Sequence, residues 1–203
     1  MTESIGPASS FVRPELPPAD AYSRLVAYGR SHYPSAIWGN LPPIDVAADV
    51  VDAERWLRSE IADPRVTGVY LGFDTLNEED GDGHNVEVGF TSDADPKSTD
   101  LGWIRKLSYG RKHLIRGIYE LHSEYKVDFD ELEGDDVELE QLEDLTIELD
   151  LLFYEMYGAI ILMAAIQSVA PQESALFVWG MHDGDVRPLC RRSPMGFERI
   201  VAG

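Results

Sequence analysis

The chain has 203 residues, a formal net charge of −20 and one cysteine, Cys190. The charge argues against nonspecific binding to nucleic acid or to an anionic membrane, and it favours attraction of a basic partner. A single cysteine excludes an intrachain disulfide. We find neither the pattern of a signal peptide nor an apolar run of the ~20 residues that span a membrane. We therefore expect a cytoplasmic protein.

The first quarter of the chain predicts two helices behind a loose arm. Residues 1–18 are rich in Pro and Ser and form the expected arm, and residues 19–203 form one expected domain. The first helix is expected from Ala19 to His32. The second is expected to run to Ala62 from Asp45, whose side chain can cap its first turn. The inward stripe of this second helix contains Val46, Val50, Ala53, Trp56 (or Leu57) and Ile61.

Alternation of apolar and other residues predicts two β-hairpins. Val66–Leu76 and Val86–Thr91 flank a segment dense in turn-forming residues, and Ala175–Met181 and Val186–Arg192 flank another. We expect an α+β fold in which the two antiparallel β-hairpins form one sheet. A long central helix and flanking helices pack against this sheet.

The segment Leu101–Lys126 is basic and predicts an amphipathic helix with an interruption near Gly110. Its apolar residues Leu107, Leu114 and Ile118 fall on one helical face. Its lysines and arginines are a candidate counter-charge for the acidic segment that follows.

A long helix is expected from Asp136 to Ala170, in two unlike halves. The first half has carboxylates on one face and leucines on the other, whereas the second half is apolar on every side and must be buried. Glu140, Asp144 and Glu148 are like charges four residues apart, and each such pair costs ~0.2 to 0.5 kcal/mol. This cost indicates that another group neutralises the acidic face.

The acidic block predicts a docking surface for a basic protein partner, because complementary charge speeds association and selects partners. The leading interpretation is a non-enzymatic binding protein of the inhibitor or immunity type, with no cofactor and no catalytic residue. A solvated or internally paired surface and an oligomerising structural module are the other interpretations. The expected partner-binding residues are Asp128, Asp130, Glu131, Glu133, Asp135, Asp136, Glu140 and Asp144.

The two predicted turns carry the residues for a competing interpretation, a metal-dependent hydrolase. Imidazole and carboxylate ligands suit a divalent metal that activates water. The same residue types are also common in hairpin turns, and the EF-hand pattern fails because Thr91 occupies the twelfth position from Asp80. The candidate ligands are Asp80, Asp82 and His84 in the first turn and His182, Asp183 and Asp185 in the second.

Overall fold

The fold is described in a computed structural model, which covers residues 8–33, 36–73, 85–98, 100–125, 136–169, 174–181, 186–193 and 196–199. Helices and strands are both present, so the α+β class is confirmed. The longer helices are α1 (Pro18–His32), α2 (Val46–Glu60), α3 (Arg116–Tyr125), α4 (Asp136–Asp150) and α5 (Gly158–Ser168), and a π-helical segment, η6 (Leu151–Tyr157), joins the last two. Short 3-10 helices are η1 (Ala8–Phe11), η2 (Ala36–Gly39) and η4 (Gly102–Lys106). The strands are β1 (Gly68–Phe73), β2 (Val86–Thr91), β3 (Ser108–Tyr109), β4 (Ala175–Met181), β5 (Val186–Ser193) and β6 (Gly196–Arg199).

The described strands form one six-stranded mixed sheet in the order β3-β2-β1-β4-β5-β6. Strands β1 and β4 are parallel, and every other neighbouring pair is antiparallel. The prediction of a sheet made of two antiparallel hairpins therefore does not match. Parallel neighbours need a long crossover connection, and here the chain passes through α3, α4 and α5 between β2 and β4.

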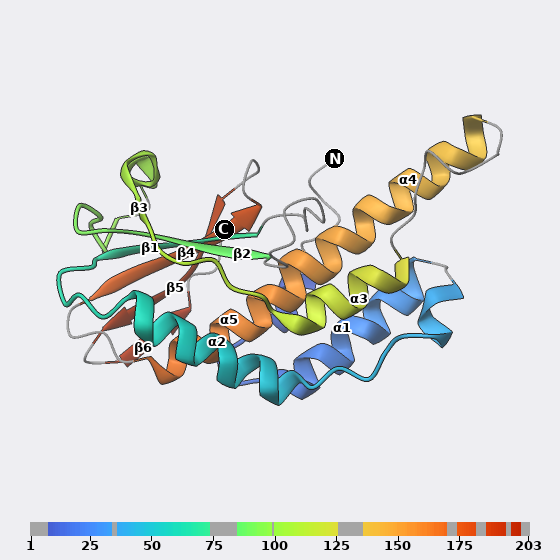
Figure 1. The fold of residues 1–203 in the computed structure, drawn as a ribbon, viewed down its shortest axis with the longest axis horizontal. Coiled ribbons are helices and arrows are strands. Elements are labelled where there is room, and N and C mark those ends of the chain that lie inside the picture. The colour runs from blue at the N-terminus through green and yellow to red at the C-terminus, as the bar shows by residue number, and fades with distance from the viewer. Residues whose placement is uncertain are drawn as a thin grey trace.

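Alternating residues of the sheet face two different apolar clusters. Val69, Leu71 and Phe73 of β1 belong to the main core, which lies between the sheet and the helices α1, α2 and α5 (Figure 1). On the opposite face, Tyr70 packs with Trp103 of η4 in a smaller cluster. The sheet is therefore covered by helices on one side and by the η4 segment on part of the other.

The prediction of a helix over Leu101–Lys126 is wrong for its first half. The segment forms η4, then the edge strand β3, and only Arg116–Tyr125 is α-helical. Leu107 packs on Gly89, where an added Cβ would lie 2.7 Å from its Cδ1. The buried Asn85 side chain then bonds both the N–H and the carbonyl of Ile115, each at 2.9 Å. These contacts hold the chain against β2 until α3 begins.

The predicted long helix runs without a break from Asp136 to Ser168. It is not a uniform α-helix, because its middle segment η6 is π-helical. Its second half is buried on all sides as the apolar pattern predicts. Contrary to the expectation that no apolar run is long enough, the stretch Gln141–Ser168 could cross a membrane by length and composition alone, and 88% of its most apolar window is buried inside the fold. Those apolar side chains form the centre of the main core.

The N-terminal segment and α2 show how local sequence places the flanking helices. Val12 is buried and Phe11 packs on the main core, and the side-chain amide of Gln167 donates to the carbonyl of Pro14 at 2.8 Å. At the start of α2, the Asp45 carboxylate accepts the backbone N–H of Ala48 at 3.0 Å, which confirms the predicted cap.

Candidate functional site

The exposed face of α4 combines carboxylates with an apolar side chain. Glu143 and Asp144 are exposed, and Ile147 is 50% exposed. Residues three and four positions apart lie next to each other on a helix, so Ile147 is flanked by both acids. The N-terminal end of α4 projects beyond the sheet and the other helices toward the upper right of Figure 1.

Three of the predicted partner-binding residues lie on α4. Asp136 and Glu140 belong to its first turns, and Asp144 is exposed near its middle. The sequence prediction did not single out Ile147, although its position at i+4 from Glu143 places it within the acidic face. The remaining five predicted residues, Asp128, Asp130, Glu131, Glu133 and Asp135, lie outside the described residues.

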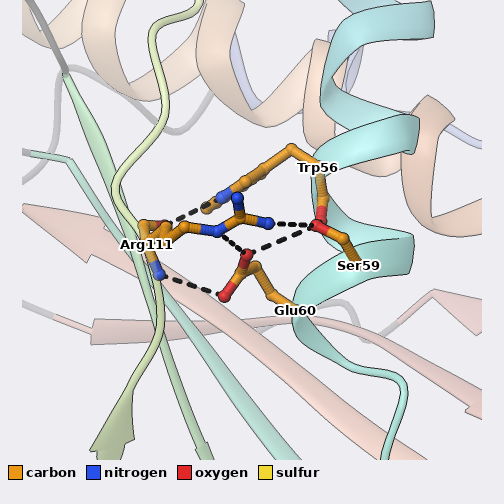
Figure 2. A network of polar contacts seen from close by, with 4 residues as sticks. All are labelled: Trp56, Ser59, Glu60 and Arg111. Atoms are coloured by element: carbon orange, nitrogen blue, oxygen red, sulfur yellow. Dashed lines mark hydrogen bonds and ion pairs between the residues drawn. The ribbon is translucent and has the colours of Figure 1, made fainter.

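Within the described residues, no lysine or arginine of the basic segment forms an ion pair with Glu143 or Asp144 of this face. Arg111 instead binds the end of α2, where its Nε donates to Glu60 Oε1 at 2.7 Å and its backbone N–H donates to Glu60 Oε2 at 3.0 Å. Trp56 Nε1 and Ser59 Oγ complete this network (Figure 2). Partial burial acts to raise the pKa of Glu60, but the Arg111 hydrogen bonds outweigh it and the pKa is lowered. Neither Glu143 nor Asp144 forms an ion pair with a described residue.

Both candidate metal clusters lie outside the described residues: Asp80, Asp82 and His84 in one connection, and His182, Asp183 and Asp185 in the other. The strands that lead into these connections end side by side, because Phe73 of β1 is in register with Met181 of the parallel strand β4. Within the described ranges, no group of three or more His, Cys, Asp or Glu side chains is arranged to hold a metal ion.

A buried carboxylate, Glu155 of η6, lies on the same side of the sheet as Trp179. It is 5% exposed, and its Oε2 lies 3.5 Å from Nη1 of Arg187, the β5 residue opposite Trp179. Regular α-helical spacing counted from Asp136 would place Glu155 on the same side as Glu140 and Asp144, which is the acidic face. The π-helical winding changes that spacing, and π-helical turns often occur at functional sites.

A second buried carboxylate, Asp49 of α2, was also missed. It is 6% exposed, and its Oδ2 accepts the Tyr157 hydroxyl at 2.7 Å and the Gly117 N–H at 2.9 Å. Asp49 thus caps the first turn of α3 from another helix. A signal was present in the sequence, because Asp49 falls three residues after Val46 and four before Ala53 on the inward stripe of α2.

The open face of α4 is thus the described surface that best fits the predicted docking role, while the two buried carboxylates hold helices and sheet together. Comparison of the chain with protein-family models, with curated proteins and with solved structures found no match.

Proposed function

We propose that the protein is a non-enzymatic binding protein whose α4 face docks a basic protein partner. The observation that carries this proposal is the exposure of Glu143 and Asp144, without ion pairs to described residues, on a helix that projects from the fold (Figure 1). The net charge of −20 supports it, because a strong field of one sign steers an oppositely charged protein toward the surface.

The composition of the face also fits docking. Binding energy at protein interfaces concentrates in a few apolar or aromatic anchors, and surrounding polar groups set specificity. Ile147 has the position of such an anchor, since it is half exposed between Glu143 and Asp144. An inhibitor or immunity role requires a partner surface that places lysines and arginines around a shallow apolar depression.

The test uses basic proteins encoded beside the gene for this protein. Each is purified, and its Kd for the protein is measured by calorimetry at 50 and 300 mM NaCl. The double variant Glu143→Gln/Asp144→Asn should raise the Kd roughly tenfold at low salt. The effect should shrink at high salt, because ions screen exposed charges. Ile147→Ala should raise the Kd at both salt concentrations, because it removes apolar contact.

A matched control separates this face from the total charge of the protein. Glu15→Gln/Asp93→Asn removes two exposed carboxylates from other parts of the fold, so the net charge changes equally. We expect this control to change the Kd less than threefold. Equal effects of the two double variants would show that overall charge, and not the α4 face, attracts the partner.

A metal-dependent hydrolase is the second candidate, and the register of β1 and β4 supports it. Phe73 and Met181 are paired, so the connections that carry His84 and His182 start from adjacent strands. Imidazole and carboxylate side chains are the ligands that suit a divalent metal that activates water. If this candidate is correct, Zn²⁺ or Mn²⁺ should raise the Tm of the protein, and His84→Ala/His182→Ala should abolish that rise. An unchanged Tm at saturating metal would count against it.

A further inference from the structure

Three aromatic rings gather at the end of α1. The rings of Tyr28 and His32 are stacked, with centroids 4.0 Å apart and planes 23° from parallel. Tyr33 meets Tyr28 edge-on at 6.2 Å. His32 Nδ1 lies 2.8 Å from the Tyr28 carbonyl oxygen, which can only accept, so Nδ1 donates and fixes the ring. His32 is exposed, and the two tyrosines are half-buried.

This aromatic group is attached to the acidic side of α4. The Tyr33 hydroxyl donates to Glu148 Oε2 at 3.1 Å, and Asp144 lies one helical turn before Glu148. Burial and the charge of Glu148 raise the pKa of Tyr33 well above its usual value. Tyrosine is protonated at neutral pH with an ordinary or a raised pKa, so the Tyr33 hydroxyl is the donor in this bond and holds the rings beside the Glu148 carboxylate.

We propose that the basic partner is engaged through arginine side chains, which lie over the Tyr28–His32 ring pair and bind the carboxylates of Asp144 and Glu148. This inference rests on the proposed docking function and adds the kind of residue that the partner presents. A planar guanidinium stacks on an aromatic ring and at the same time donates two parallel hydrogen bonds to a carboxylate. A lysine ammonium is a compact, strongly hydrated charge that gains less from the ring face.

The test compares two labelled peptides, octa-arginine and octa-lysine, by fluorescence anisotropy at 50 mM NaCl. The unaltered protein should bind octa-arginine at least about threefold more tightly than octa-lysine. Tyr28→Leu/His32→Leu should bring the ratio of the two Kd values close to one, whereas Tyr28→Phe should preserve it. Because His32 is exposed, His32→Ala is a milder variant that should fold in any case and should lower the ratio.

The Glu143→Gln/Asp144→Asn variant separates this inference from the docking proposal. It should weaken both peptides, and octa-arginine at least as much as octa-lysine, because Asp144 is one of the carboxylates that would bind the guanidinium. If it weakens neither peptide, the docking proposal itself fails. If it weakens both while the aromatic variants leave the ratio as it was, or if the ratio is one from the start, only the preference for arginine is overturned.

Discussion

Replacement of Asp49 by alanine should lower the free energy of unfolding by about 3 kcal/mol. The substitution leaves two buried donors without an acceptor, the Tyr157 hydroxyl and the Gly117 N–H, which now bond Asp49 Oδ2. It also removes the N-terminal cap of α3, because no other described side chain accepts a hydrogen bond from the first turn of this helix. Urea denaturation followed by circular dichroism measures the change.

Asp49→Asn is the matched control, because it keeps a side-chain oxygen that can accept both bonds. Burial raises the pKa of Asp49, although the Tyr157 hydroxyl and the N–H groups of Gly117 and Arg116 act to lower it. A raised folded pKa means that the carboxyl contributes most stability below its unfolded pKa of about 3.9, and that this contribution is lost as the pH rises through the folded value. The loss of unfolding free energy caused by Asp49→Asn should therefore be smaller at pH 7 than at pH 4. A loss below 1 kcal/mol for Asp49→Ala would show that water replaces the carboxylate.

Gly158→Ala should destabilise the protein by about 2 kcal/mol, even though alanine is the better helix former by about 1 kcal/mol. Gly158 of α5 lies against Phe73 of β1, and an added Cβ there would overlap the ring edge of Phe73. That ring is completely buried and packs edge-on against Trp179, with centroids 6.1 Å apart. Both rings are buried, so room for the methyl group requires the ring or the helix to shift, and this shift is the expected cost.

Two comparisons test this explanation by thermal unfolding. Gly39→Ala adds the same methyl group at a position where no heavy atom lies within 4 Å, so the Tm should change by less than about 2 °C. Phe73→Leu should be destabilising alone, and in combination with Gly158→Ala the two losses should be less than additive. Full additivity would mean that the methyl group and the ring do not compete for space.

Sequence patterns predicted the elements whose signals are local. The Asp45 cap, the inward stripe of α2 and the alternation of β1 and β2 all depend on residues a few positions apart, and the structure contains each of them. The dry second half of the long helix also follows from its composition alone.

Other features depend on contacts between distant parts of the chain, and local patterns do not contain them. The parallel pairing of β1 with β4 joins segments separated by three helices. The segment 101–115 has helical periodicity, yet Asn85 and Gly89 hold it along the sheet edge. The burial of Glu155 does not follow from regular α-helical spacing, because it lies in a π-helical segment, which has no reliable sequence signature and changes the angle between successive side chains.

The π-helical segment also affects how the helix responds to a change of length. A π-turn contains about one residue more than an α-turn, so η6 (Leu151–Tyr157) holds an extra residue while the helix continues from α4 into α5. Deletion of one residue within a uniform α-helix would rotate everything before it by roughly 100° about the axis. Deletion of one residue from η6 would instead allow the segment to rewind as an α-helix, and the azimuth of the acidic face of α4 would change little. The segment can therefore absorb the loss of one residue without turning the carboxylates away from their present direction.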